Sequence, residues 1–436
     1  MGSTLDPIAV RTAPDAPRSS FKRVLTGSMA GAVLEWYDFA IYGILAATVL
    51  GPLFFPGSDG ITKLLLALAT QGLGFIARPL GGIVFGHLGD RFGRKPMLVI
   101  TFVMLGTATA SIGLLPTYEQ IGIWATVLLV ALRMIQGFAL GGEFGAAVLL
   151  VSEYGEPKRR GFWASWPQAG APSGTVLAAV VVSTLVLLLP ADAFDAWGWR
   201  IAFLFAVPLL VIGFWIRHGV EESPVFRAAQ AAAADRPEPR SSIVEALSRP
   251  RPVLIGIGMR LGENIAFYVY TIFVIAYATT YHGFARGDVM LAVTFASVFQ
   301  FVGMIGGGRW SDRVGRRVAM LVPAVVLVVW APVFFWLVQM QSVPMLWVGV
   351  CVGAFFHGAL AGPEAAWITE LFPTRYRYAG SSLVFQGSSI IAGAPAPFIA
   401  VWLVDRFGVG TVVAYLVVTM MITVVAVLSS RETKGI

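Results

Sequence analysis

Long apolar stretches dominate the chain and alternate with short polar ones. Twelve of these stretches approach the roughly 20 residues that an α-helix needs to cross a bilayer. Single apolar and polar residues do not alternate as they would in the strands of an outer-membrane barrel. The pattern predicts an all-α integral membrane protein with transmembrane helices at residues 24–50, 63–88, 97–115, 121–150, 162–189, 199–217, 252–280, 288–309, 318–338, 344–369, 379–403 and 410–429.

One long polar break divides these helices into two sets of six. The break covers residues 219–251 and is rich in proline and in charges of both signs. We therefore expect two six-helix bundles, at residues 24–218 and 252–430. The break would form a central loop, and residues 1–23 and 431–436 would form short tails.

The two sets also resemble each other in sequence. Gly86-His-Leu-Gly-Asp90-Arg91-Phe-Gly93-Arg94-Lys95 recurs as Gly308-Arg-Trp-Ser-Asp312-Arg313-Val-Gly315-Arg316-Arg317. Each copy joins the second and third helices of its set. Internal repeats are a recurring device of membrane transporters, which bind their substrates between the repeats near the middle of the bilayer.

Composition and charge narrow the class further. Hydrophobic residues make up 57% of the chain and charged residues 13%, whereas soluble domains are about a quarter charged. Most of the 31 Lys and Arg residues, Arg217 among them, lie in loops on the side of both termini. Cationic residues prefer cytoplasmic loops, so the net charge of +7 indicates topology rather than a nucleic-acid partner. We expect a multi-pass protein of a bacterial inner membrane with both termini in the cytoplasm.

Five acidic residues lie inside the predicted helices: Glu35, Asp38, Glu143, Glu263 and Glu364. They occupy the first, fourth, seventh and tenth helices. Ionisable groups in a bilayer are costly and usually face a water-filled cavity or each other. Acids in every third helix therefore predict four helices that line one cavity, as in a secondary transporter.

Several motifs resemble those of the major facilitator superfamily and, within it, of the metabolite:proton symporter family. The repeated loop motif resembles the superfamily. The family resemblance rests on Glu35-Trp-Tyr-Asp-Phe39, Arg78-Pro-Leu-Gly-Gly82, Arg133-Met-Ile-Gln-Gly137, Gly141-Gly-Glu143 and Glu221-Glu-Ser-Pro224. It implies a twelve-helix fold and a functional monomer. The substrate would be a di- or tricarboxylate, a shikimate-like acid, or a zwitterionic osmolyte such as proline or betaine.

Glu35 and Asp38 are three residues apart and share one face of the first helix. Two carboxylates in a poorly hydrated site cannot both ionise cheaply, so one of them is expected to bind a proton. We therefore predict that Glu35, Asp38, Arg133 and Glu143 couple transport to protons. The alternative is that the two acids form structural pairs with Arg78 or Arg133.

Arg133 and Gln136 lie at mid-depth in the fourth helix, and Arg260, Glu263 and Asn264 lie at the same depth in the seventh. An arginine from each half facing one cavity would bind carboxylates through its guanidinium fork. Alternatively, each arginine only neutralises the acid beside it. Further candidate substrate ligands are Tyr37, Tyr42, Gln168, Tyr268, His357 and Gln386.

The two loop motifs combine glycines with charges of both signs. This combination favours a breakable clasp between the halves over a plain basic turn. The predicted gating residues are Arg78, Gly86, Asp90, Arg91, Arg94 and Glu153 in the first half and Asp312, Arg313, Arg316 and Glu370 in the second.

No nucleotide-binding loop, nucleophile motif or metal-ligand cluster stands out in the sequence. We therefore expect a transporter rather than an enzyme, with the proton as coupling ion and no other cofactor. The sequence favours a proton-coupled symporter that imports a small organic acid by alternating access. The alternative is a proton-coupled symporter of a zwitterionic osmolyte.

Overall fold

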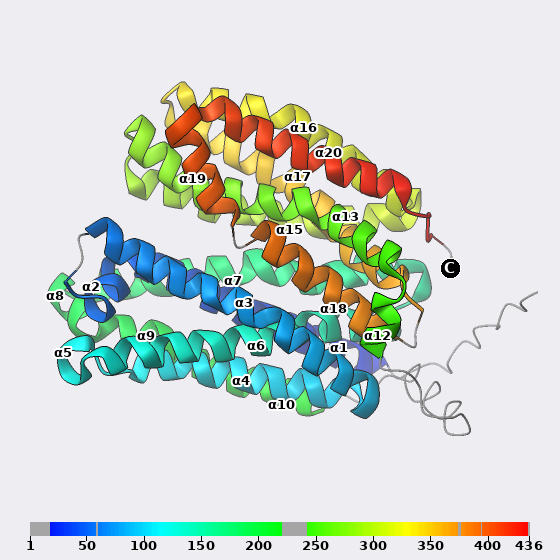
Figure 1. The fold of residues 1–436 in the computed structure, drawn as a ribbon, viewed down its shortest axis with the longest axis horizontal. Coiled ribbons are helices and arrows are strands. Elements are labelled where there is room, and N and C mark those ends of the chain that lie inside the picture. Colours follow the sequence, from blue (N-terminus) through cyan, green and yellow to red (C-terminus); the bar gives the residue numbers. More distant parts are fainter. Residues whose placement is uncertain (1–17, 58–59, 220–241, 374–375, 394, 435–436) are drawn as a thin grey trace, which may run out of the picture.

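Long helices account for most of the chain (Figure 1). The computed structural model describes residues 18–57, 60–219, 242–373, 376–393 and 395–434. Within them, ten helical segments are long and apolar enough to cross a membrane. The two other predicted stretches, 24–50 and 63–88, lie in long helices as well. The all-α membrane fold predicted from the sequence is therefore confirmed.

The N-terminal half is a bundle of long helices, seen from blue to green in Figure 1. They are α1 (Arg18–Leu45), α3 (Gly60–Phe92), α4 (Arg94–Leu114), α6 (Ile123–Tyr154) and α7 (Arg160–Leu188), followed by a sixth segment that contains the short α9 (Trp199–Leu204) and α10 (Ala206–His218). The short helices α2 (Gly51–Phe54), α5 (Tyr118–Ile121) and α8 (Ala191–Ala193) lie in the connections at one end of this bundle.

The C-terminal half repeats this plan, from green to red in Figure 1. Its helices are α13 (Pro250–Tyr268), α14 (Val274–Ala276), α15 (Arg286–Val314), α16 (Arg316–Gln339), α17 (Val343–Glu370), α18 (Arg377–Ser388), α19 (Ala396–Phe407) and α20 (Val409–Ser429). A short helix, α12 (Ser242–Leu247), precedes α13 and packs against α18 and α3. The predicted helix at 379–403 is thus divided between α18 and α19.

The glycines Gly93 and Gly315 form the tight turns of the repeated motif. Each lies directly before a helix, α4 or α16, with φ of 107° and 99° respectively. Residues with a Cβ rarely adopt such angles, so the motif needs glycine at this position in both copies. We call the end of the molecule that carries these two turns the motif end.

Glycines also let the second and fourth helices of each half approach closely. A Cβ on Gly137 of α6 would lie 1.9 Å from the carbonyl oxygen of Gly74 in α3. A Cβ on Gly303 of α15 would lie 2.2 Å from the carbonyl oxygen of Phe355 in α17. Such contacts gain dispersion energy, which matters because lipid tails offer helices no hydrophobic drive to associate.

The halves meet chiefly through their fifth helices. Helix α7 of the N-terminal half packs against α15 and α17, and α18 of the C-terminal half packs against α3 and α6. At the motif end, a Cβ on Gly308 of α15 would lie 2.5 Å from the carbonyl oxygen of Gly161 in α7. Gly86 of α3 faces the backbone of Ala379 in α18. The molecule is therefore closed at its motif end.

Two glycines on α15 provide a matched test of this close packing. Gly303→Ala should lower the unfolding temperature in detergent, because overpacking costs about 1–3 kcal/mol. Gly306→Ala should leave it unchanged or raise it, since Gly306 is exposed with no atom within 4 Å of the added Cβ. Alanine is also the better helix former, by about 1 kcal/mol. Equal unfolding temperatures of the two variants would contradict the packing argument.

Candidate functional site

Asp38 is the centre of a buried polar network in the N-terminal half. Its carboxylate accepts hydrogen bonds from Arg133 Nη1 at 2.7 Å, Gln136 Nε2 at 2.8 Å and Thr109 Oγ1 at 2.9 Å. Asp38 is 2% exposed and Arg133 4%. The pairing of Asp38 with Arg133 and the nearness of Gln136 fit the sequence analysis, whereas Thr109 was missed. The only signal for Thr109 was a threonine at mid-depth in the third predicted helix.

Arg133 has donors that this network does not use. Its Nε and Nη2 are buried and have no hydrogen-bond partner among the described residues. The guanidinium lies over the ring of Tyr42, 3.5 Å from its centre. Arg133 also lines a small cavity together with Asp38, Phe75, Arg78 and Gln136. Its volume of about 20 Å³ leaves room for about one water.

Glu35 faces the same region and pairs with Arg78. Arg78 Nη2 lies 3.6 Å from Glu35 Oε1, and its guanidinium lies over the ring of Phe75. Sequence analysis placed Arg78 among the gating residues, but the structure places it beside the cavity. The reason is helix geometry: Arg78 precedes Asp90 by 12 residues, which is about 18 Å along α3 at 1.5 Å per residue.

Glu143 is bound to Arg217, a partner that sequence analysis did not find. Arg217 Nη2 donates to Glu143 Oε1 at 2.7 Å, while Nε and Nη1 donate to the carbonyl oxygens of Gly27 and Leu98. The sequence predicts a loop position for this arginine, but it is fully buried at the end of α10. It fills the place of a side chain at Gly31, where a Cβ would lie 1.6 Å from Nη2. Arg217 therefore ties together α1, α4, α6 and α10.

Arg260 is the centre of the corresponding network in the C-terminal half. It donates from Nη1 to Glu364 Oε2 at 2.7 Å and from Nε to Ser388 Oγ at 3.1 Å. Its Nη2 lies 3.6 Å from Glu263 Oε2. The structure thus brings Glu364 beside Arg260, a pairing that the sequence analysis did not predict. The side chain of Asn264 donates to the carbonyl oxygen of Arg260.

His357 connects this network to α15. Its Nε2 lies 3.0 Å from Glu263 Oε1, and its Nδ1 lies 2.9 Å from Gln300 Nε2. Both His357 and Gln300 are almost fully buried. Gln300, like Thr109, is a member of a buried network that the sequence analysis did not single out.

A layer of aromatic rings lies between the two networks. Trp36 packs against Phe267 with ring centres 5.0 Å apart, and Phe39 and Phe75 lie 6.3 and 6.4 Å from Tyr268. We call these five residues the aromatic seam. The lining residues of the cavity beside Arg133 all belong to the N-terminal half. The structure therefore does not bring Arg133 and Arg260 into one cavity, as the sequence analysis expected, because the seam fills the space between them.

Other candidate ligands hold helices together in this conformation. Gln168 Nε2 donates to the carbonyl oxygen of Ala361 at 3.4 Å, and Gln386 Nε2 donates to that of Gly141 at 3.2 Å. The Tyr378 hydroxyl donates to the carbonyl oxygen of Gly142. All three contacts join the two halves. Tyr37, in contrast, donates to Ala202 within the N-terminal half.

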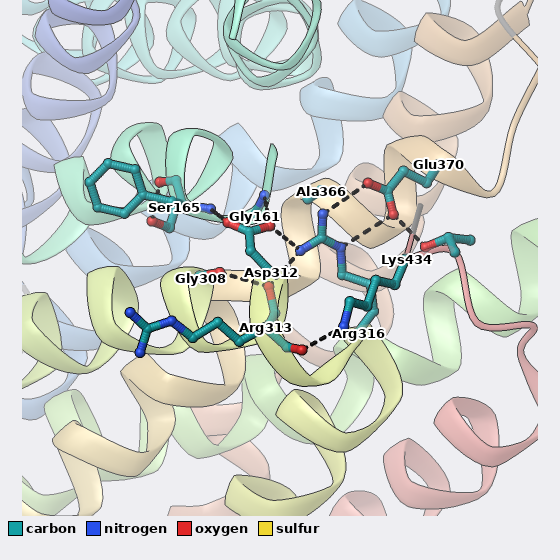
Figure 2. A network of polar contacts seen from close by, with 12 residues as sticks. Gly161, Ser165, Gly308, Asp312, Arg313, Arg316, Ala366, Glu370 and Lys434 are labelled. Atoms are coloured by element: carbon teal, nitrogen blue, oxygen red, sulfur yellow. Dashed lines mark hydrogen bonds and ion pairs between the residues drawn. The ribbon is translucent and has the colours of Figure 1, made fainter. Parts of the chain in front are cut away.

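Asp312 forms a clasp at the motif end (Figure 2). From α15, its carboxylate accepts hydrogen bonds from the backbone N–H groups of Gly161 and Phe162, both at 2.8 Å. These groups belong to the first turn of α7, where N–H groups have no partner in their own helix. A carboxylate there also interacts favourably with the helix dipole. Asp312 of one half therefore caps a helix of the other.

Arg316 holds this carboxylate in place from within the C-terminal half. Figure 2 shows its guanidinium between Asp312 and Glu370, with distances of 2.8 Å to Asp312 Oδ1 and 3.1 Å to Glu370 Oε1. The side chain of Arg313 is exposed, as is that of Arg91. The side chains of Asp90, Arg94 and Glu153, predicted to form the matching clasp, lie outside the described residues.

The C-terminal tail extends the clasp. Glu432 accepts hydrogen bonds from the backbone N–H groups of Arg316 and Arg317 at 2.9 Å and so caps α16. Thr433 donates to Glu370, and Lys434 Nζ donates to the carbonyl oxygen of Arg313. Partial burial raises the pKa of Glu432, but the surrounding backbone N–H groups outweigh this effect and hold it below its usual value. The described residues contain no group of three His, Cys, Asp or Glu side chains that could hold a metal ion.

Comparison with known proteins gives a family match over most of the chain. A family model of the Major Facilitator Superfamily matches residues 29–390 and 262–435. The shikimate transporter of Escherichia coli (strain K12) is 37% identical over 99% of this chain and 100% of its own length. The proline/betaine transporter of the same strain is 35% identical over 92% of this chain and 81% of its own length.

A solved structure supports the same fold. The major facilitator superfamily proton:xylose symporter XylE, bound to 6-bromo-6-deoxy-D-glucose, superposes with a TM-score of 0.75. The superposition covers 96% of this chain and 98% of that protein at 17% identity. This likeness concerns the fold alone.

The cap on α16 yields a pH-dependent prediction. Glu432→Gln should lower the unfolding temperature at neutral pH, because the amide is neutral and has one acceptor oxygen in place of two. The pKa of Glu432 is lower in the folded protein, so its stabilisation is full above the unfolded pKa and is lost as pH falls through the folded one. The difference between variant and wild type should therefore disappear in acid.

Glu156→Gln is the matched control for this prediction. Glu156 lies 3.5 Å from Arg159, and both side chains are 55% exposed. Exposed pairs contribute about 0–1 kcal/mol, so this variant should unfold close to the wild-type temperature at every pH. The proposed cap would be contradicted if Glu432→Gln lowered the unfolding temperature by the same amount at neutral and at acidic pH.

Proposed function

Since the chain belongs to the major facilitator superfamily, we propose that it is a proton-coupled symporter that imports a small organic acid by alternating access. It is a multi-pass membrane transporter and not an enzyme. The proposed substrate is a di- or tricarboxylate or a shikimate-like hydroxy acid. The proposed location is the inner membrane of a bacterium, with the motif end and both termini in the cytoplasm and one chain as the functional unit.

The unused donors of Arg133 carry this proposal. Nε and Nη2 form the side edge of a guanidinium, which binds a carboxylate through two parallel hydrogen bonds. Buried donors without a partner are costly, so a ligand that satisfies them gains free energy. The nearby Gln136 Oε1 is buried too, with no hydrogen-bond partner in the described part of the chain, and it can accept a hydrogen bond from a substrate hydroxyl. A carboxylate beside a hydroxyl satisfies both groups.

Substrate access requires the halves to move. The cavity beside Arg133 has room for about one water, so an organic acid enters only when the aromatic seam parts. The clasp of Asp312 on α7 keeps the motif end closed while the seam opens. Release on the other side then requires the clasp to break. These two closures, at different depths, are what alternating access needs.

Proton coupling would act through the buried acids. Protonation of Asp38 removes the charge that holds Arg133 Nη1, and it frees the guanidinium to turn toward a substrate carboxylate. Glu35, paired with Arg78 at the longer distance of 3.6 Å, is a second acceptor on the same helix face. Glu143 is held by Arg217 at 2.7 Å within its own half. We therefore propose Asp38 and Glu35 for coupling and a supporting position for Glu143.

A zwitterionic osmolyte is the second candidate, and one arrangement favours it. Glu263 and Glu364 share a single arginine, so this cluster has negative charge that a substrate ammonium can compensate. The rings of Trp36, Phe267 and Tyr268 lie between this cluster and the network around Arg133, and aromatic faces attract quaternary ammonium groups. Arg133 would then bind the carboxylate of the osmolyte.

Uptake into proteoliposomes tests the proposed function. With an imposed pH gradient, alkaline inside, one of α-ketoglutarate, citrate, shikimate or a simple monocarboxylate should accumulate. A protonophore should abolish this accumulation, because the gradient supplies the energy. Accumulation of proline or betaine alone would favour the second candidate. Accumulation that persists with the protonophore would contradict proton coupling.

Substitution of Arg133 tests its role in the same assay. Arg133→Lys keeps the charge beside Asp38 but lacks the fork, so the half-saturating concentration of the acid should rise about tenfold or more. Arg309→Lys, at an exposed position of α15, is the control and should leave this concentration unchanged. An unchanged value for Arg133→Lys would contradict the substrate contact.

Substitution of Asp38 tests its role in proton coupling. Asp38→Asn cannot change its charge, so gradient-driven accumulation should be lost. Exchange of external for internal substrate should persist, because exchange requires no net proton movement. The two assays are run on the same proteoliposomes, with wild type as reference. Full accumulation by Asp38→Asn would remove Asp38 from the coupling mechanism.

A further inference from the structure

The charges buried in the two halves are balanced differently. In the N-terminal half each buried acid has its own arginine, in the pairs Glu35–Arg78, Asp38–Arg133 and Glu143–Arg217. In the C-terminal half, Glu263 and Glu364 both pair with Arg260. Among these pairs, five acids share four arginines, and the acid without an arginine of its own lies in the C-terminal half.

The geometry of this cluster leaves its carboxylates incompletely satisfied. Glu364 is 0% exposed, and Arg260 Nη1 donates to its Oε2 at 2.7 Å. Its other oxygen, Oε1, has no hydrogen-bond partner among the described residues, and neither has Glu263 Oε2. A buried ion without full compensation costs several kcal/mol even after the protein relaxes. Two ionised carboxylates on one guanidinium are therefore unfavourable here.

His357 does not supply the missing positive charge. An amide nitrogen only donates hydrogen bonds, so Gln300 Nε2 makes His357 Nδ1 an acceptor without a proton. The remaining ring proton lies on Nε2 and is donated to Glu263 Oε1. The imidazole is thus neutral while Gln300 keeps this orientation. It positions Glu263 but leaves the charge of the cluster at minus one.

The helices that pack against α13 and α17 supply no free buried cation among the described residues. Their buried polar residues include Gln300 of α15, Ser388 and Gln386 of α18, Thr419 and Thr423 of α20 and Gln168 of α7, all of them uncharged. The buried Arg316 of α16 is already paired with Asp312 and Glu370. Across the aromatic seam, Tyr268 packs against Phe39 and Phe75, and the nearest charged groups of the N-terminal half are Glu35 and Arg78. Glu35 and Arg78 already compensate each other.

We propose that Glu263 and Glu364 together bind one exchangeable proton, which makes the cluster around Arg260 a proton-binding site of the C-terminal half. With the proton the cluster is neutral, and without it the cluster carries one negative charge. A deprotonated cluster repels an anion approaching across the seam, so the acid substrate binds together with the proton. The proton enters from water as one carboxylate becomes a carboxylic acid. It returns to water when the substrate leaves. This inference rests on the proposed transport of an acid anion.

A measurement without substrate tests the proton site itself. Infrared difference spectra of the purified protein in lipid, recorded during a pH titration, should contain a carboxylic-acid C=O band that titrates. The band should be lost or shifted in both Glu263→Gln and Glu364→Gln, because neutralising either acid removes the need for the proton. It should remain in the control Glu119→Gln, whose side chain is exposed. A band that is identical in wild type and both cluster variants would overturn the proposal.

Binding of an acid tests the link to substrate. Shikimate is the probe, or the acid that accumulates in the uptake panel. Its affinity for wild type should fall about tenfold per pH unit once the cluster loses its proton, because binding then requires the uptake of one. In Glu364→Gln this contribution to the pH dependence should be absent, so the affinity should fall less steeply with pH than in wild type, and only the dependence due to Asp38 and Glu35 should remain. This variant should also exchange substrate without accumulating it.

The outcomes separate the inference from the proposed function. Affinity for the acid that rises with pH would overturn the inference, because loss of the proton from the cluster would then favour binding of the anion instead of opposing it. The inference would also be overturned if the affinity depended on pH equally in wild type, Glu263→Gln and Glu364→Gln. If none of the tested acids is transported, the proposed function fails. The infrared titration of the substrate-free protein still decides whether the cluster holds the proton.

Discussion

Pairing of buried arginines with carboxylates is the constraint on which the interior of this protein depends. Removing an ion from water is so costly that each buried acid must meet a cation, and breaking such a pair costs about 3–5 kcal/mol. The pairs also fix the positions of helices, since Arg217 reaches α1, α4 and α6 from α10. Even the absence of a side chain at Gly31 follows from the charge pairing, because the guanidinium of Arg217 occupies that space.

The contacts between the halves are of another kind. Gln168, Gln386 and Tyr378 donate to backbone carbonyls of the opposite half, and Asp312 accepts from backbone N–H groups. The ion pairs at mid-depth stay within one half. Separation of the halves thus exposes single hydrogen-bonding groups to water without breaking a buried ion pair. This difference lets each half move as a rigid body about a weaker boundary.

The helices and the two motif copies could be predicted from the sequence because each is marked by residues that are close together in the chain. Apolar stretches mark the membrane segments, and Gly93 and Gly315 occur at equivalent motif positions with the same unusual backbone angle. Spacing along one helix also placed Arg260 beside Glu263. It did not reveal Glu364 as the stronger partner of Arg260, since 104 residues separate them. Arg217 was missed because its position at a helix end resembles a loop. The aromatic seam depends on which conformation the halves adopt, and no pattern within a single helix records this.

The clasp of Asp312 on α7 has a consequence for the pattern of substitutions expected among homologous sequences. The carboxylate binds the main chain of Gly161 and Phe162, and any amino acid other than proline supplies the same N–H group. A change in the side chain at Phe162 therefore leaves the partner of Asp312 intact. Among homologous sequences, the acid would be retained without any residue of α7 varying in step with it. Methods that infer contacts from correlated substitutions would overlook this contact between the halves.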